Sequence, residues 1–180
     1  FGQMIGTDDY PVFFNGENQV YAYKLCPSKT GYANAPAPAD NEEHNFVDSV
    51  CTICGELKPP AQDEDGYYII TTVGELYWFA DYVNNKGHYD ANAKLGNDIT
   101  VNENVLDEDG YLNEGEFRVW MPVAHGYWYR DVYDDMGDWI GTEEGYEYYS
   151  GHFDGQGFTI SGLYYDDSGR DYRDYIGFFG

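Results

Sequence analysis

The sequence predicts a mainly β fold with one short helix. In the second half of the chain, short runs of β-branched and aromatic residues alternate with turns rich in Gly, Asp and Asn. Only residues 72–83 combine an N-terminal capping pattern with the 3.6-residue apolar period of a helix. The 20 Tyr among 180 residues suit sheet faces, because a ring buries a large area while its hydroxyl stays hydrated.

We expect three sections along the chain. Residues 1–25 hold Asn15-Gly16 between two aromatic runs, which predicts an N-terminal strand pair that completes or docks on a neighbouring unit. Residues 26–60 form a small module of loops around all three cysteines. Residues 61–180 follow a Pro-Pro pair and an acidic run, and they form the main domain.

The main domain opens with a strand and the helix. The run Tyr67–Thr71 has strand propensity, and Thr72 with Glu75 three residues later forms a capping box. One apolar helix face follows at Leu76, Phe79, Ala80 and Val83, and Gly87 marks the expected end. Short strands are then expected at residues 99–101, 117–120, 146–149, 158–160 and 176–179.

The charge of the chain limits its partners. The formal net charge of −24 and the pI near 4.1 argue against nucleic acid, because phosphate binding needs clustered Lys and Arg. Anionic membrane surfaces are disfavoured for the same reason. No stretch approaches the roughly 20 apolar residues of a membrane span, so we expect no membrane insertion. The chain has neither a starting Met nor a signal peptide, and we expect it to be part of a longer protein.

The cysteines give the sharpest local motif. Cys51 and Cys54 form a Cys-x2-Cys knuckle followed by Gly55, in which two thiolates can reach one ion. Cys26 and His44 lie upstream and complete a set of four ligands by elimination. Four such ligands match the tetrahedral demand of a closed structural Zn²⁺ site and leave no open position for catalysis. Such a metal would stabilise a section that has little apolar material of its own.

A Cys51–Cys54 disulfide or plain thiols remain the alternative at this motif. An odd number of cysteines leaves one thiol unpaired, which fits a disulfide framework poorly in a secreted protein. The acidic runs 63–66 and 107–110 hint at Ca²⁺ loops, but neither continues into the twelve-residue EF-hand spacing. We interpret them as solvated acidic turns and leave weak Ca²⁺ binding open.

Several motifs together resemble a known family. They are Ala91–Ile99, Trp120–Val123, the run Tyr149–Tyr164 containing Gly-His-Phe-Asp-Gly-Gln-Gly-Phe-Thr-Ile-Ser-Gly-Leu, and the closing Ile176–Gly180. This pattern resembles the GLUG-type repeats of adhesin-like bacterial cell-surface proteins, and the Cys/His section resembles knuckles found between their domains. Phe178-Phe179 departs from the Leu-Phe of that pattern, and residues 111–117 fit no part of it.

The resemblance implies a fold and a role. The fold is a right-handed parallel β-solenoid with one short capping helix, in which Gly155 and Gly157 turn a corner with positive φ. Each coil then buries its inner face, with Phe153, Phe158, Ile160 and Leu163 inward, only when another coil stacks on it. The role is a structural or adhesive unit outside the cell, at the bacterial surface. Its partners would be neighbouring copies or domains of the same protein, docked through Phe1, Ile5, Ile176, Phe178 and Phe179.

Carbohydrate binding is the alternative function. Tyr127, Trp128 and Tyr129 form an aromatic run whose rings could stack on sugars, although strand alternation would divide such rings between two faces. An enzyme is disfavoured, including a polysaccharide-degrading one. No basic residue stands in a carboxylate-rich cluster with a matching spacing, and adjacent pairs such as Glu143-Glu144 face opposite sides of a strand.

Overall fold

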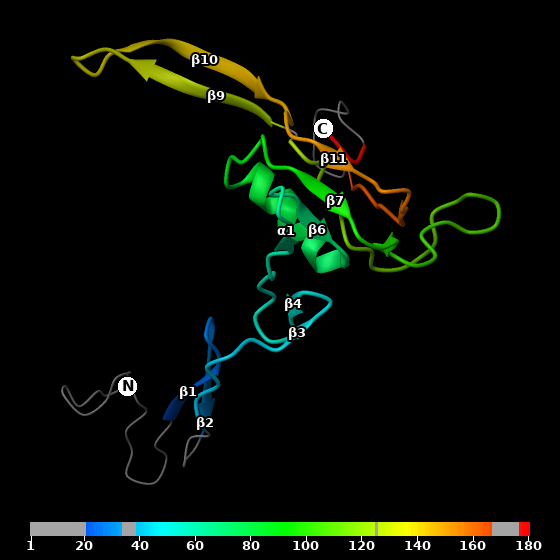
Figure 1. Cartoon of the computed structure of the whole chain (residues 1–180). Coiled ribbons are helices and arrows are strands. Elements are labelled where there is room, and N and C mark those ends of the chain that lie inside the picture. The colour runs from blue at the N-terminus through cyan, green and yellow to red at the C-terminus, as the bar shows by residue number, and fades with distance from the viewer. Residues whose placement is uncertain (1–20, 34–38, 125, 167–176) are drawn as a thin grey trace. The chain divides into compact units, whose positions relative to one another are not determined.

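The computed structural model describes residues 21–33, 39–124, 126–166 and 177–180, and the chain divides into two compact units (Figure 1). The first unit is residues 1–58 and the second is residues 59–180. The strand pair predicted around Asn15-Gly16 lies outside the described residues. No helix in the described ranges has the length and apolar character needed to cross a membrane.

Two short antiparallel hairpins build the described part of the first unit. Strand β1 (Tyr21–Cys26) pairs with β2 (Lys29–Ala33), and β3 (Phe46–Val47) pairs with β4 (Val50–Cys51). The segment between the hairpins is bound to β1, because Asn41 N–H donates to the Lys24 carbonyl at 2.8 Å. This contact holds the segment that follows β2 against β1.

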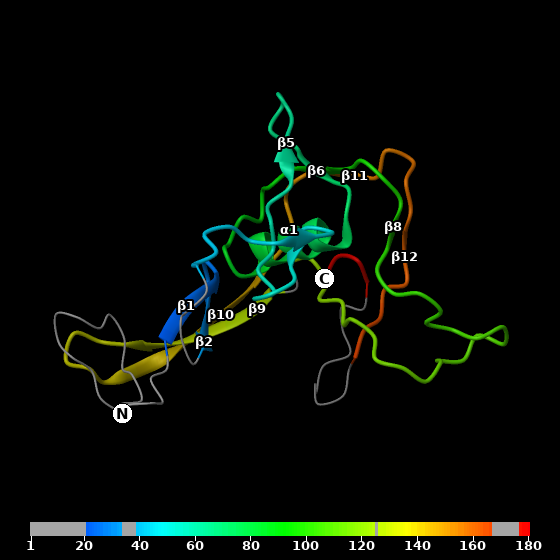
Figure 2. The ribbon, with the colours of Figure 1, turned by 90° about the horizontal axis from the view of Figure 1, so that it is seen from below.

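A mixed four-stranded sheet lies at the centre of the second unit. Its strand order is β11-β7-β6-β5, with β5 at Ala61–Gln62, β6 at Tyr68–Ile70, β7 at Ala93–Leu95 and β11 at Phe153–Asp154. The β6–β7 and β7–β11 pairs are parallel, whereas β5–β6 is antiparallel. A separate parallel pair joins β8 (Ile99–Thr100) to β12 (Ile160–Ser161), and Figure 2 shows these strands side by side.

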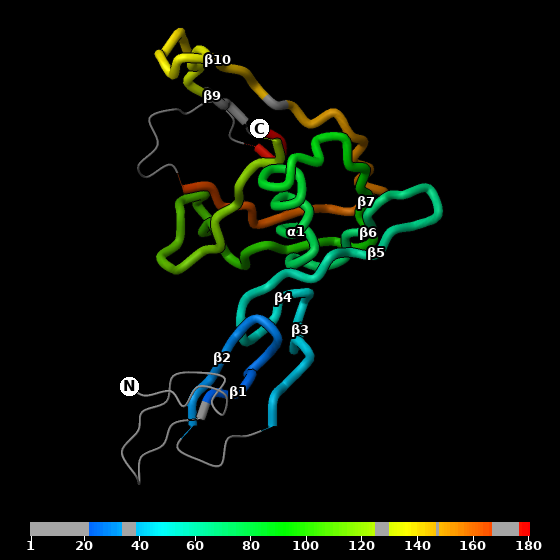
Figure 3. Tube along the Cα trace, turned by 90° about the vertical axis from the view of Figure 1, so that its left-hand side faces the viewer, coloured from blue at the N-terminus to red at the C-terminus, as the bar shows by residue number. Residues whose placement is uncertain are grey.

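The predicted helix is confirmed as α1, residues Val73–Asn84, which lies beside β6 and β7 (Figure 3). Thr72 is its N-cap and accepts a hydrogen bond from the Glu75 N–H. The Glu75 carboxylate accepts from the N–H and the hydroxyl of Thr71, both at 2.8 Å. Gly87 takes a positive φ of 75° just after the helix.

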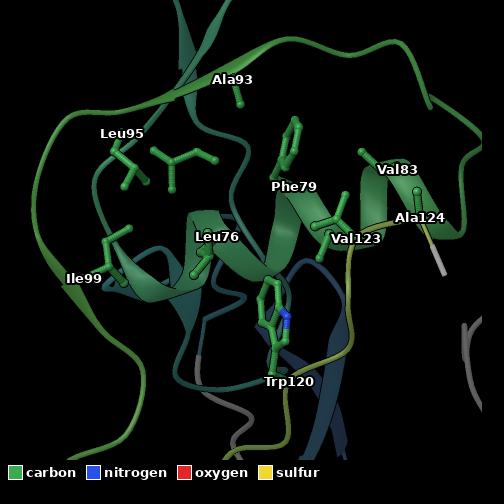
Figure 4. Close-up of a cluster of buried hydrophobic side chains, with 11 residues drawn as sticks. Leu76, Phe79, Val83, Ala93, Leu95, Ile99, Trp120, Val123 and Ala124 are labelled. Atoms are coloured by element: carbon green, nitrogen blue, oxygen red, sulfur yellow. The ribbon is translucent and has the colours of Figure 1, made fainter. Parts of the chain in front are cut away.

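One apolar cluster joins the helix to the sheet. Phe79 projects from α1 toward the strand that carries Ala93 and Leu95 (Figure 4). The buried members are Ile70, Leu76, Phe79, Ala80, Val83, Ala93, Leu95, Ile99, Trp120, Val123 and Ala124. Asn84 holds the segment with Trp120 against the helix, because its side chain donates to the Pro122 carbonyl and accepts from the Ala124 N–H. Aliphatic residues therefore fill most of the centre, and aromatic rings surround it.

The longest strands form a separate antiparallel hairpin. Strand β9 (Gly126–Tyr133) pairs with β10 (Trp139–Glu147), with a register irregularity between Trp139 and Gly141. Figure 1 shows the pair as a two-stranded ribbon. A two-stranded ribbon of this length is marginal on its own, so it depends on turn chemistry and cross-strand pairs.

The predicted right-handed parallel β-solenoid is wrong. The described residues form small sheets of two to four strands, and the parallel pairs extend over only two or three residues each. The longest pairing, β9 with β10, is antiparallel. The apolar face of α1 covers the sheet, so the interior is closed by a helix rather than by a stack of coils.

Two details of the predicted corner also differ. Gly157 has the expected positive φ of 81°, but its partner is Gln156 at 50° rather than Gly155. Phe158, expected to point inward, is exposed, whereas Phe153, Ile160 and Leu163 pack at the margin of the core. The Gly-rich motif therefore marks a real turn without forming the inner corner of a coil.

Candidate metal centre

Three cysteines and one histidine converge in the first unit. Cys26 ends β1, His44 precedes β3, Cys51 ends β4, and Cys54 lies in the turn that follows β4. Their four candidate ligand atoms all lie within 4.8 Å of one another. Cys26 and Cys51 are 0% and 2% exposed. These four groups could hold a metal ion, and they are the four residues selected from the sequence.

The knuckle around Cys51 and Cys54 is built by the backbone. Gly55 N–H donates to the Cys51 carbonyl at 2.9 Å, and Cys51 N–H donates to the Glu56 carbonyl at 2.8 Å. Gly55 has a φ of 79°, a left-handed conformation that glycine adopts without strain. The backbone N–H groups of Ile53 and Cys54 point at the Cys51 sulfur, and that of Glu56 points at the Cys54 sulfur. Donors in this arrangement stabilise thiolates.

The environment separates the pKa values of the two knuckle thiols. Burial raises the pKa of Cys51. The N–H groups of Cys54 and Ile53 and the contact with His44 outweigh the effect of burial, and together they lower the pKa of Cys51 to about 6. The Glu56 N–H lowers the pKa of Cys54, but burial and the neighbouring sulfurs of Cys51 and Cys26 raise it to about 11. Adjacent sulfurs thus resist holding negative charge together, which is the repulsion that a bound cation relieves.

The orientation of His44 assigns its two ring nitrogens. Nδ1 lies 3.5 Å from the Cys54 sulfur, and Nε2 lies 3.4 Å from the Glu56 Oε2 atom. The Ser28 hydroxyl donates to the same Glu56 oxygen at 2.6 Å. A carboxylate on the outer nitrogen of a histidine ligand fixes its tautomer and strengthens the inner nitrogen as a donor. Nδ1 is therefore the nitrogen that faces the sulfurs.

Glu56 and Ser28 were missed by sequence reasoning. Glu56 follows directly after the Cys-x2-Cys-Gly motif, so its position was available as a signal. Ser28 lies 28 residues earlier and reaches Glu56 only because both hairpins meet at the cluster. The Lys29 ammonium group also binds the Ile53 carbonyl inside the knuckle at 3.0 Å. Together these contacts form a polar shell around the four candidate ligands.

The two acidic runs considered for Ca²⁺ form hairpin turns in which the first Asp accepts hydrogen bonds from backbone N–H groups of the same turn. Asp63 Oδ1 accepts from the N–H groups of Asp65 and Tyr67, and Asp107 Oδ1 accepts in the same way from those of Asp109 and Tyr111. Within the described ranges, the Cys/His cluster is the only set of three or more His, Cys, Asp or Glu side chains that could hold an ion. Weak Ca²⁺ binding stays a prediction.

Asp63 also binds Lys94, a basic residue that lies among several carboxylates. Its Oδ2 atom accepts from the Lys94 ammonium group, and Asp65 and Asp154 lie close enough to raise the pKa of Lys94 further. The Lys94 ammonium group lies 5.9 Å from the centre of the Tyr67 ring. Sequence reasoning found no such cluster, because its members come from the turn before β6, from β7 and from β11. The ion pair ties the turn to the sheet.

The predicted carbohydrate contacts lie on β9. The register pairs Tyr127 with Tyr146, Trp128 with Gly145 and Tyr129 with Glu144. The side chains of these three β9 residues are outside the described part of the chain. Successive strand positions alternate between faces, so the three cannot form one platform together.

The predicted assembly residues are described only in part. Phe1, Ile5 and Ile176 lie outside the described residues. Phe178 stacks on Trp120 with ring centroids 5.2 Å apart, so it belongs to the margin of the core. Phe179 contacts Tyr149 and Phe153 and is still 41% exposed.

Comparison of the chain with family models, with curated proteins and with solved structures finds no match. The resemblance to GLUG-type repeats therefore stays a prediction, and the candidate functions rest on the residues themselves.

Proposed function

We propose that the first unit binds one structural Zn²⁺ ion through Cys26, His44, Cys51 and Cys54. The observation that carries this proposal is the convergence of four ligand atoms within 4.8 Å. Ligands around tetrahedral zinc are separated by about 3.8 Å, given Zn–S bonds near 2.3 Å, so modest closure would complete the site. Thiolate and imidazole ligands select zinc over magnesium or calcium, which prefer oxygen.

The composition of the first unit supports a structural role for the ion. Among its described residues, the only buried hydrophobic residues are Cys26 and Cys51 themselves. A unit without an apolar core needs another source of stability, and metal binding supplies free energy of folding directly. Four protein ligands leave no position for a substrate or a reactive water, which favours a structural over a catalytic centre.

Metal analysis of the full chain tests the proposal. Protein purified without chelators is expected to contain one zinc per chain, and Co²⁺ exchange should give the absorption of a tetrahedral thiolate site. Cys26→Ser and His44→Asn should each weaken metal binding, because each removes one ligand. His88→Asn is the matched control, since it removes an exposed imidazole of the second unit. A metal-free protein with a Cys51–Cys54 disulfide would contradict the proposal.

We also propose that the second unit serves a structural or adhesive role outside the cell, as part of a bacterial surface protein, by contact with neighbouring copies or domains. Strands β11 and β12 are the last strands of their sheets among the described residues, and Phe179, which contacts Phe153 of β11, is partly exposed. Unpaired strand edges favour addition of another strand. Light scattering and electron microscopy of the full chain would test this role. A strictly monomeric protein at all concentrations would argue against contact between copies.

A further inference from the structure

The β9–β10 hairpin has two chemically different faces. Asp131 pairs with Thr142 and Arg130 pairs with Glu143, so these adjacent pairs point to opposite sides of the ribbon. The Arg130 guanidinium donates to Glu143 through Nε at 2.8 Å and through a terminal nitrogen at 2.6 Å. One face of the ribbon therefore carries an ion pair. Tyr133 and Trp139 are paired on the Asp131 side, which makes the other face aromatic.

Trp139 is exposed on this face, and its orientation is fixed. The indole is 59% exposed. Its Nε1 donates to Asp131 Oδ1 at 3.2 Å, and the Thr142 hydroxyl donates to the same oxygen at 2.9 Å. An indole held in this way presents a flat apolar surface to solvent without free rotation. A ligand that stacks on it would lose little side-chain entropy of the protein.

Further rings extend the aromatic face along the ribbon. Tyr133, directly opposite Trp139, is 58% exposed. Tyr146 lies in the same row of β10, roughly 20 Å from Trp139 at the usual rise of an extended strand. The rings of Tyr146 and Tyr148 are nearly parallel, with centroids 6.1 Å apart. Aromatic positions separated in this way suit a long, repetitive ligand better than a single small molecule.

The charge of the hairpin restricts the ligand further. Residues 126–147 contain seven acidic residues and one basic residue, Arg130, which is bound to Glu143. An anionic chain would meet repulsion along the whole ribbon. The ligand that fits is neutral, offers flat C–H surfaces to the rings and carries hydroxyl groups for the carboxylates.

We propose that this face of the β9–β10 hairpin binds a neutral, hexose-based polysaccharide. One sugar ring stacks on Trp139, because the positive C–H edges of a pyranose are attracted to the negative face of the indole. Both bonds that orient Trp139 and Thr142 use Asp131 Oδ1, and Asp131 Oδ2 is the acceptor for a sugar hydroxyl. Tyr146 and Tyr148 contact the same polymer several sugar units away. This site is independent of the metal centre.

Affinity electrophoresis of the full chain tests the site. Native gels containing hydroxyethyl cellulose, galactomannan or soluble starch are expected to retard the protein, and gels containing polygalacturonate are not. Trp139→Ala should weaken the binding about tenfold or more, because the stacking surface is lost. Tyr111→Ala is the matched control, since Tyr111 is 72% exposed in a different turn and should leave retardation unchanged.

Two variants of Asp131 distinguish its role in orienting the Trp139 indole from the role of its negative charge. Asp131→Asn keeps an oxygen that can accept from Trp139 and Thr142 but replaces the Oδ2 acceptor by an NH2 donor, so binding should weaken less than in Asp131→Ala. Asp131→Ala removes that acceptor and should weaken binding, because the indole is no longer held. Circular dichroism of each variant would verify that the chain remains folded.

Three outcomes would overturn the proposal. The first is that no neutral polysaccharide retards the wild-type protein. The second is that Trp139→Ala binds as well as the wild type, or that polygalacturonate binds equally. The third is that Trp139→Ala abolishes self-association while no glycan binds, which would assign the aromatic face to contact with a second copy of the chain.

Discussion

Gly162 and Gly157 show how differently two residues of one Gly-rich motif can matter. Both have a positive φ, at 68° and 81°. A Cβ on Gly162 would lie 2.0 Å from the Asn102 carbonyl oxygen, whereas a Cβ on Gly157 would meet nothing within 4 Å. This close approach lets the Asn102 side chain donate to the carbonyls of Gly162 and Arg118, both at 2.9 Å.

We therefore predict unequal costs for the two alanine substitutions. Gly157→Ala should lower the free energy of unfolding by about 1 kcal/mol, the cost of left-handed backbone alone. Gly162→Ala should lower it by about 2–4 kcal/mol, because a steric clash with the Asn102 backbone is added. Urea unfolding followed by tryptophan fluorescence measures both. Equal costs would show that Asn102 is not packed against Gly162.

Glu56 offers a second prediction at the residue scale. Glu56→Gln keeps the size of the side chain but weakens its hold on His44 Nε2, so metal affinity should fall about 10–100-fold. Competition with a chromophoric chelator measures the affinity. Glu43→Gln is the control, because Glu43 is an exposed carboxylate of the same unit and is not one of the four candidate ligands. Equal affinity of Glu56→Gln and wild type would show that Glu56 does not orient His44.

The sequence identified the four candidate ligands but not the polar side chains that surround them. The spacing of Cys51 and Cys54 is local and describes the knuckle by itself, and elimination added Cys26 and His44. Ser28 and Glu56 belong to the site only through the folding of two separate hairpins. Trp139 was not selected from the sequence, because its hydrogen-bond partner Asp131 is brought to it only by the register of the hairpin.

At the scale of elements, the link between the turn at Asp63 and strand β7 should respond to pH. The hydrogen bond from Lys94 and the N–H of Tyr67 hold the pKa of Asp63 below its usual value. A carboxyl group whose pKa is lower in the folded state stabilises the fold at pH values above its pKa in the unfolded chain, which is near 4. This stabilisation is lost as the pH falls through the pKa of the folded state. The pKa of Lys94 is raised in the folded state, so its contribution to stability is lost at alkaline pH, as the pH rises through that pKa.

Lys94→Met tests this link. The variant should melt at a lower temperature than wild type at pH 7, and the difference should shrink as the pH falls through the lowered pKa of Asp63, because the protonated carboxyl no longer forms the ion pair. Lys86→Met, an exposed lysine just after α1, should show no such pH dependence. Thermal unfolding followed by tryptophan fluorescence gives both midpoints. A difference that stays constant as the pH is lowered from 7 until the protein unfolds would mean that Lys94 acts through packing of its stem.

Elements with local signals were predictable, and their assembly was not. The Thr72 cap and the apolar period of residues 76–83 lie within a few positions of one another, so α1 followed from the sequence. The solenoid did not form, because the motif around Gly157 and Gly162 specifies turns and close approaches rather than the number of stacked layers. That α1 would cover the sheet depends on contacts between distant segments, such as Asn84 with Pro122.

At the scale of the whole molecule, the two units have different sources of stability. The second has an apolar cluster that contains no residue of the first, and no buried polar or charged residue is found among the described residues. In the described part of the first, only the two cysteines are buried hydrophobic residues. Hydrophobic burial thus stabilises the second unit, and we expect coordination of the proposed metal ion to stabilise the first.

Chelation should therefore affect the two units unequally. All four Trp residues lie in residues 59–180, so tryptophan fluorescence reports on the second unit alone. Adding EDTA to the full chain should raise proteolytic cleavage within residues 21–58, because loss of the ion removes the force that holds both hairpins. The tryptophan melting midpoint should stay unchanged, because the apolar cluster does not involve the metal ligands. Equal protection of residues 21–58 with and without EDTA would show that the four side chains do not need an ion to stay together.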